Sequence, residues 1–183
     1  MHPSAYGQEP RAAKGDDMTR DTYIRITNRT RLLTARLPGG ERMLRLPTLL
    51  CAVSYIAALF ALMLTRDIRL VRALIVPAAC FILCTVLRPL IGRQRPYDCF
   101  DAEPVGRFVR GKGKSMPSRH TASAAAIAIA VAWAFPSPLI IILMTLLCIL
   151  IACLRILCGQ HYPSDVLAAL LLSFAVSLIG YSI

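Results

Sequence analysis

Long apolar runs dominate the sequence from about residue 47 onward, separated by short charged connecting segments, here called joints. Five of these runs are about twenty residues long, the length that an α-helix needs to cross the bilayer core. We expect these spans at about 47–65, 70–91, 118–135, 137–157 and 165–182. Because a spanning segment must satisfy its own backbone hydrogen bonds, the pattern predicts an all-α polytopic membrane bundle with about five transmembrane helices.

The lengths of the joints determine where the charged residues meet. The stretch 92–117 is the only long joint between the expected spans, and it is rich in Gly, Lys and Arg. With five spans, the joints 92–117 and 158–164 lie on one membrane face together with the N-terminus, whichever way the bundle is inserted. The charged ends of four spans are therefore expected to converge on that face.

The segment 1–45 is expected to form a polar, basic N-terminal region ahead of a membrane domain at 46–183. Its first twenty residues have the Pro, Gly and charge content of a disordered stretch. The stretch 21–37 mixes Ile and Leu with Arg, which predicts either an interfacial basic helix on anionic lipid or a solvated tether. The first apolar run begins too late for a cleavable leader and is expected to be a retained span.

The charge balance narrows the class of partner. The chain has 21 Lys and Arg against 10 Asp and Glu, a net charge of +11. Such an excess favours nucleic acid, an anionic membrane surface or a phosphate-bearing substrate. The arginines lie between apolar spans and no nucleic-acid motif is present, so the bilayer and a lipid phosphate are the expected partners.

The cysteines indicate no metal site. Seven occur, mostly inside apolar runs, without a CxxC pair. Their spacing relative to the histidines fits no zinc site, and small buried free thiols are the expected state. The sequence predicts no metal and no cofactor.

Three short polar segments lie on the shared face: RPLIGRQRP from Arg88, PSRH from Pro117, and RILCGQHYPSD from Arg155. Arginine forks suit phosphate oxygens, which makes Arg88, Arg95 and Arg155 candidate phosphate ligands. Ser118 adds a hydroxyl beside the start of a span, where free backbone N–H groups favour an anion.

Two of the three histidines belong to the same segments; the third, His2, lies in the N-terminal tail. Asp165 follows His161 by four residues, one helical turn, so its carboxylate can hold the Nδ1–H and leave Nε2 as a nucleophile. His120 can then donate a proton to the leaving oxygen. With the arginines, these residues describe a metal-free site for phosphoryl transfer.

The three segments resemble the motifs KxxxxxxRP, PSGH and SRxxxxxHxxxD of the type 2 phosphatidic acid phosphatase family, the membrane branch of a superfamily shared with vanadium-dependent haloperoxidases. Their order and spacing match. The resemblance implies that His161 is the nucleophile, Asp165 its orienting partner and His120 the general acid. It implies phosphate binding by five residues: Arg88, Arg95, Ser118, Arg119 and Arg155.

The sequence departs from the family pattern at three motif positions. Arg88 replaces a lysine, Arg119 a glycine, and Leu154 the serine before Arg155. The side chain of Arg119 must therefore turn away from the phosphate or join its ligands. Family members usually have six spans, so the basic N-terminal segment stands where the first span would be.

The expected activity is hydrolysis of a lipid phosphomonoester or diphosphate through a phosphohistidine. Phosphatidate, phosphatidylglycerophosphate and polyprenyl diphosphate all fit. The alternatives are a lipid phosphotransferase and a catalytically silent protein that binds anionic lipid. The first 45 residues carry nine Lys and Arg, which by the positive-inside rule places the site on the cytoplasmic face, in a bacterial cell membrane.

Overall fold

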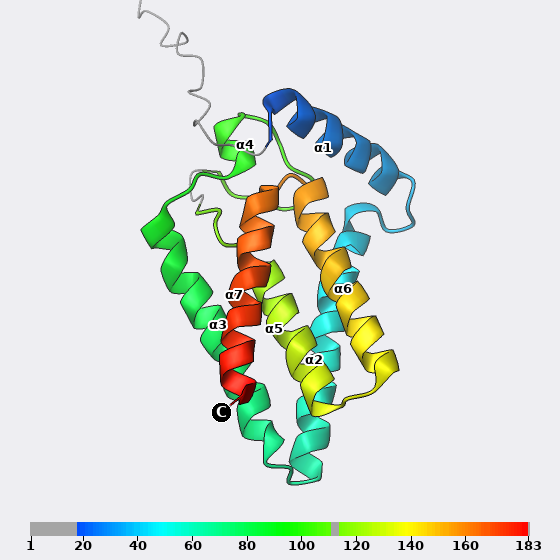
Figure 1. Ribbon diagram of the computed structural model, residues 1–183. Helices are drawn as coiled ribbons and strands as arrows, with labels where there is room; N and C mark the ends of the chain where they lie inside the picture. The colour runs from blue at the N-terminus through cyan, green and yellow to red at the C-terminus, as the bar shows by residue number, and fades with distance from the viewer. Residues whose placement is uncertain (1–17, 111–113, 183) are drawn as a thin grey trace, which may run out of the picture.

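The computed structural model describes residues 18–110 and 114–182, and within them it is all-helical. The elements are α1 (Arg20–Ala35), the 3₁₀ helix η1 (Gly40–Arg45), α2 (Leu46–Leu64), α3 (Arg69–Ile91), α4 (Pro96–Cys99), α5 (Arg119–Ala134), α6 (Pro138–Leu157) and α7 (Pro163–Ser182). The five expected spans correspond closely to α2, α3, α5, α6 and α7. They run alternately up and down the bundle (Figure 1).

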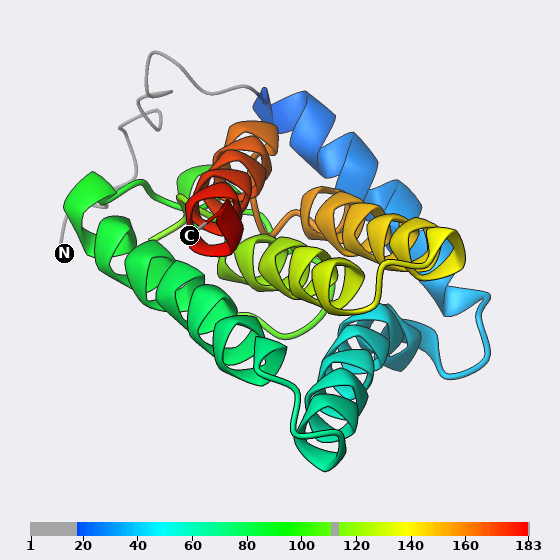
Figure 2. The same cartoon turned by 60° about the horizontal axis from the view of Figure 1, so that its bottom comes forward.

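The expected count of five spans is approximate. Four helical segments of the described chain are long and apolar enough to cross a membrane: Gly40–Leu64, Arg69–Cys99, Pro138–Leu157 and Pro163–Ser182. The remaining one, α5, has only 16 residues. It packs against α2, α3, α6 and α7 and lies at the centre of the bundle (Figure 2). The long helices therefore face the lipid, and α5 is largely enclosed by them.

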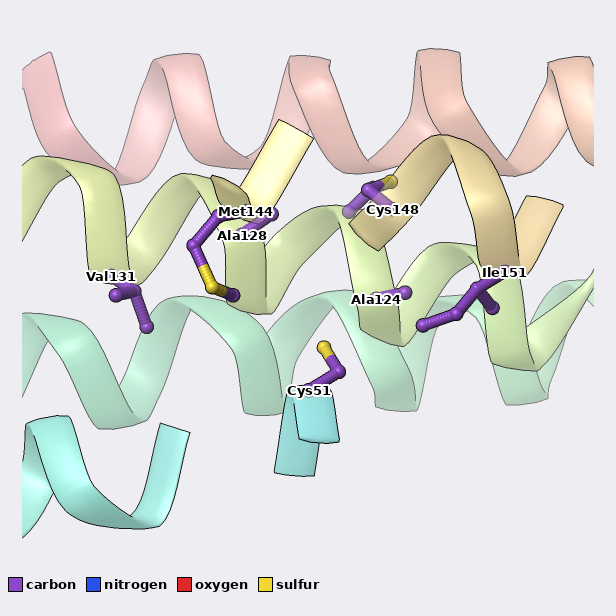
Figure 3. Close-up of a cluster of buried hydrophobic side chains, with 8 residues drawn as sticks. Cys51, Ala124, Ala128, Val131, Met144, Cys148 and Ile151 are labelled. Atoms are coloured by element: carbon purple, nitrogen blue, oxygen red, sulfur yellow. The ribbon is translucent and has the colours of Figure 1, made fainter. Parts of the chain in front are cut away.

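Alanines make this central position possible. Most of the buried side chains of α5 are Ala, and small residues let helix backbones approach closely in a membrane protein. On one side, Ala124, Ala128 and Val131 pack against α2 and α6 (Figure 3). The partners drawn there are Cys51 from α2 and Met144, Cys148 and Ile151 from α6. The cysteines serve as small apolar packing residues, and all seven are free thiols.

The helix α1 lies across one end of the bundle (Figure 1). Its buried residues are Tyr23, Thr27, Thr30 and Thr34, which recur every three or four positions and so form one face. The exposed side chains of α1 include Leu32, Leu33 and the three arginines between Tyr23 and Leu32. The described part of the N-terminal segment is thus a helix packed on the bundle. Disorder was expected over the first twenty residues. Residues 1–17 lie outside the described residues, whereas Met18 is buried, Thr19 is the N-cap of α1 and Arg20 is its first residue, so the expectation was wrong for these three.

The long joint between α3 and α5 begins at a helix stop. Gly92 ends α3 with φ at 65°, a left-handed conformation that glycine adopts without steric cost. Pro89 is tolerated inside the last turn of α3, and α4 starts at Pro96 after an extended N-cap at Arg95. Arg88 and Arg95 therefore do not lie on one continuous helix. All the polar segments meet at the end of the bundle covered by α1.

Candidate active site

The turn between α6 and α7 presents His161. Gly159 has φ at 69°, and the backbone N–H of His161 donates to the carbonyl of Arg155 at 3.2 Å. Pro163 then begins α7 as its first residue, a position that needs no N–H donor. This places Asp165 in the first turn of α7, next to the imidazole and fully buried.

Two polar groups converge with the imidazole on one carboxylate oxygen. His161 Nδ1 lies 3.4 Å from Oδ2 of Asp165. The same oxygen accepts a hydrogen bond from the backbone N–H of Tyr162 at 2.9 Å and another from the hydroxyl of Ser115. Ser115 Oγ also lies 3.4 Å from His161 Nδ1. The Nδ1 side of the ring is thereby engaged, which leaves Nε2 as the nitrogen available for chemistry.

The other carboxylate oxygen pairs with an arginine that the motifs did not single out. Arg93 Nη1 lies 3.0 Å from Oδ1 of Asp165, and the same side chain donates to the hydroxyl of Ser164. Its guanidinium carbon sits 4.1 Å from the ring centroid of Tyr162. The only sequence feature that could have identified Arg93 as a site residue is its position two residues before Arg95, in a non-helical stretch.

Ser115 was also missed by the sequence reasoning. It lies in the Gly- and Lys-rich part of the joint, which looks like a solvated loop, and no spacing marks it. In the structure it is fully buried, and its backbone N–H donates to the carbonyl of Arg93 at 2.7 Å. The joint is thus folded into the site.

The pKa of His161 is lowered to about 4, mainly by burial. The positive charges of Arg95 and Arg88 contribute to this lowering, whereas the hydrogen bond to Asp165 and the carboxylate charge oppose it. His161 is therefore neutral near pH 7. A neutral imidazole has the free lone pair that a nucleophile requires.

The start of α5 is bonded directly to the start of α7. Ser118 is the N-cap of α5, and its backbone N–H donates to the carbonyl of Asp165 at 3.1 Å. Its hydroxyl caps no backbone N–H and instead accepts from the hydroxyl of Thr121 at 3.1 Å. Pro117 directly precedes this N-cap. The first turn of α5 carries Arg119 and His120.

Two adjoining cavities open at this end of the bundle. The larger, about 1090 Å³, is lined by both histidines together with Arg95 and Arg155. The smaller, about 640 Å³, is lined by Arg88, Arg95 and Arg119. They share Arg95, Tyr97 and the loop residues Gly106, Arg107 and Phe108. Four candidate phosphate ligands thus line two cavities that adjoin each other.

Neighbouring groups hold two of these arginines in position. Arg88 is buried and donates to the backbone carbonyl of Lys114. Arg155 donates to the side-chain oxygen of Gln160 at 2.7 Å and to the hydroxyl of Thr48 at 3.3 Å. No carboxylate of the described residues pairs with either guanidinium, so their charges remain available to an anion.

The structure brings all eight candidate site residues to one end of the bundle. Six line the cavities: Arg88, Arg95, Arg119, His120, Arg155 and His161. Ser118 and Asp165 are fully buried and line neither cavity. The side chain of Arg119 has joined the other arginines rather than turning away. Among the residues described, no three His, Cys, Asp or Glu side chains gather as a metal site would require.

These features define a helical integral membrane protein with a cationic, two-histidine cavity at one end of its bundle. The family model of the PAP2 superfamily matches residues 69–183, and the chain belongs to that superfamily. The resemblance of its three polar segments to type 2 phosphatidic acid phosphatases is thereby confirmed.

Two solved structures share the fold. One is a transmembrane PAP2-type phosphatidylglycerolphosphate phosphatase from Bacillus subtilis, with a TM-score of 0.64 and 22% identity over 90% of this chain and 87% of that one. The other is LpxE from Aquifex aeolicus, with a TM-score of 0.65 and 20% identity over 92% of this chain and 98% of that one. Comparison with curated protein sequences gave no match.

Proposed function

We propose that this protein is a membrane phosphatase that hydrolyses a lipid phosphomonoester or diphosphate through a phosphohistidine. The observation that carries the proposal is the placement of His161. Its Nδ1 side is held by Asp165, and its ring lines the same cavity as His120. Membership of the PAP2 superfamily supports the proposal, as does the name of the Bacillus subtilis neighbour.

In the first step, Nε2 of His161 attacks phosphorus and forms a P–N bond. The P–O bond to the lipid breaks, and His120, which the negative charge of the bound phosphate keeps protonated, gives its proton to the leaving oxygen. Asp165 stabilises the positive charge that develops on the imidazole. In the second step, neutral His120 takes a proton from water, which attacks phosphorus. The P–N bond breaks, and inorganic phosphate and free His161 result.

The arginines supply the electrostatic part of this mechanism. A phosphoryl group in transfer spreads negative charge over its equatorial oxygens, and fixed cations that are already oriented stabilise it. Arg88 and Arg119 line the smaller cavity, Arg155 lines the larger one, and Arg95 lines both. The reaction as written uses no metal ion.

The location of the site suits an amphiphilic substrate. The cavities lie at the end of the bundle, near the level of the headgroups, while exposed leucines and isoleucines cover the long helices below. The head of a lipid reaches the arginines from there while its tail stays in the bilayer. The nine Lys and Arg of the first 45 residues favour a cytoplasmic site.

The test is phosphate release by purified protein in detergent with EDTA present. Wild type, His161→Ala and His120→Ala would be assayed on phosphatidate, phosphatidylglycerophosphate and a polyprenyl diphosphate. We expect release by wild type and a loss of at least about 10²-fold in each variant. No release from any lipid by folded wild type would refute the hydrolase and leave the phosphotransferase and lipid-binding alternatives.

A second assay separates the two histidines. A substrate with an acidic phenol as leaving group needs little protonation, so it should restore much of the activity of His120→Ala but not that of His161→Ala. With radiolabelled substrate, acid-labile and base-stable label should appear on wild type and be absent from His161→Ala. Equal rescue of both variants would contradict the assigned roles.

A further inference from the structure

Three arginines outside the catalytic motifs line the larger cavity. Arg42 and Arg45 come from η1, and Arg107 comes from the joint before α5. In a 3₁₀ helix the side chains at i and i+3 eclipse, so Arg42 and Arg45 project from the same face of η1. The element that precedes the first long helix thus presents two cations to the cavity that holds both histidines.

These charges are poorly compensated within the protein. No ion pair joins Arg42, Arg45 or Arg107 to a carboxylate of the described residues. Glu41 is the one acidic residue in the lining of this cavity. Like charges gathered around one concave space repel each other, and a bound anion relieves that repulsion.

The cavity is also larger than one phosphoryl group requires. Its volume of about 1090 Å³ lies at the upper end of the range for pockets that take whole small-molecule ligands, roughly 300–1,000 Å³. A single phosphate beside Arg95, Arg155 and the two histidines leaves much of it unfilled. Residues of η1 and Arg107 contribute to the lining of the remaining space.

The distribution of residues between the two cavities indicates which part of the substrate enters this space. Arg88 and Arg119 line only the smaller cavity, whereas both histidines and Arg155 line only the larger one. In the proposed mechanism the leaving oxygen lies beside His120, so the leaving portion of the substrate starts in the larger cavity. Arg42 and Arg45 line that same cavity and are absent from the smaller one.

We propose that Arg42, Arg45 and Arg107 form a second anion site, which binds a phosphate group in the leaving portion of the substrate. This deepens the proposed function and rests on it. The preferred substrates are then lipids with two phosphorus groups, either a diphosphate or a phosphomonoester joined to the lipid through a phosphodiester. A lipid with one phosphate, such as phosphatidate, leaves the second site empty.

The test compares substrates matched in their tails, in an uncharged detergent. One pair is a prenyl diphosphate and its monophosphate, and the other is phosphatidylglycerophosphate and phosphatidate with the same acyl chains. We expect wild-type kcat/KM to be about tenfold or more higher for the member with two phosphorus groups. In Arg42→Gln/Arg45→Gln that preference should fall about tenfold, mainly through KM. The control, Arg72→Gln, alters an exposed arginine of α3 at the opposite end and should keep the wild-type ratio.

A binding measurement avoids dependence on turnover. Inorganic diphosphate should raise the unfolding temperature of wild type more than phosphate does, and the difference should disappear in Arg42→Gln/Arg45→Gln. Equal kcat/KM within each pair, with equal stabilisation by the two anions, would overturn the second site while leaving the phosphatase intact. An effect of the variant seen only in vesicles of anionic lipid would also overturn it, because the arginines would then bind neighbouring headgroups. Absence of turnover of any lipid would instead count against the proposed function.

Discussion

Arg93 Nη1 lies 3.0 Å from Oδ1 of Asp165, the carboxylate whose other oxygen faces His161. The carboxyl group is completely buried, and Arg93 is only 18% exposed. A charge taken out of water is tolerated only when it is paired and hydrogen-bonded. Arg93 therefore stabilises the ionised form of the group that orients the proposed nucleophile, although it lines neither cavity.

Replacement of Arg93 should affect folding as well as activity. Arg93→Gln leaves the buried carboxylate without its cation, and we expect a loss of about 3 kcal/mol in the free energy of unfolding. Thermal unfolding in detergent measures it. The matched control is Arg110→Gln, which breaks the exposed pair with Asp101 and should change stability much less. Equal effects of the two variants would contradict the role given to Arg93.

Ser115 should matter for catalysis more than its place in a loop suggests. Its hydroxyl donates to the Asp165 oxygen that faces the imidazole. A hydrogen bond to a charged group contributes about 1.5–3 kcal/mol, so Ser115→Ala should lower kcat about tenfold or more. Ser182→Ala removes a hydroxyl that bonds only its own helix at the opposite end and serves as control. A wild-type kcat for Ser115→Ala would show that the bond does not orient the carboxylate.

The low pKa of His161 predicts how activity depends on pH. With that pKa near 4, the imidazole stays neutral over the range in which most phosphatases are assayed. The acid limb of kcat/KM in the free enzyme should accordingly fall near pH 4 rather than near 6.5. NMR titration of the labelled imidazole would assign it. In Asp165→Asn the carboxylate charge that raises this pKa is lost, so the imidazole should titrate at still lower pH.

The same shift has a consequence for stability. The folded state holds His161 neutral, whereas the unfolded state takes up a proton near pH 6.5. The titration of His161 therefore lowers the free energy of unfolding progressively as pH falls from about 6.5 to about 4. Below about pH 4 its contribution no longer changes. His161→Gln should show a weaker loss of unfolding free energy over this interval than wild type. An identical pH dependence in both would refute the depressed pKa.

Gly159 should be intolerant of a side chain. Its φ is 69°, and a Cβ would lie 2.6 Å from Cγ2 of Thr27 and 2.7 Å from the ring of Tyr23. Gly159→Ala thus combines backbone strain with a clash against α1, and should cost more than the roughly 1–3 kcal/mol of strain alone. Gly92→Ala is the control, because its φ is similar but the nearest atom is 3.9 Å away. If the two variants unfold alike, α1 is not packed as described.

Hydrophobic patterning was enough to predict the long helices, because lipid demands long apolar segments that satisfy their own backbone groups. The boundaries of α2, α3, α6 and α7 follow from the apolar runs and from residues such as Gly92 and Pro163. The pattern could not show that α5 is central, since an alanine-rich run has the same hydropathy whether lipid or helices surround it. Only its packing against four neighbours decides that.

Motif spacing was enough to predict which residues meet, because fixed spacings on alternating helices bring Arg88, Ser118, Arg155 and the two histidines to one end of the bundle. It did not determine what holds them there. Arg93 and Ser115 reach Asp165 across 72 and 50 residues of chain, and no local rule marks either. Such contacts depend on how the long joint folds over the bundle, so the environment of the buried carboxylate was decided by the tertiary structure alone.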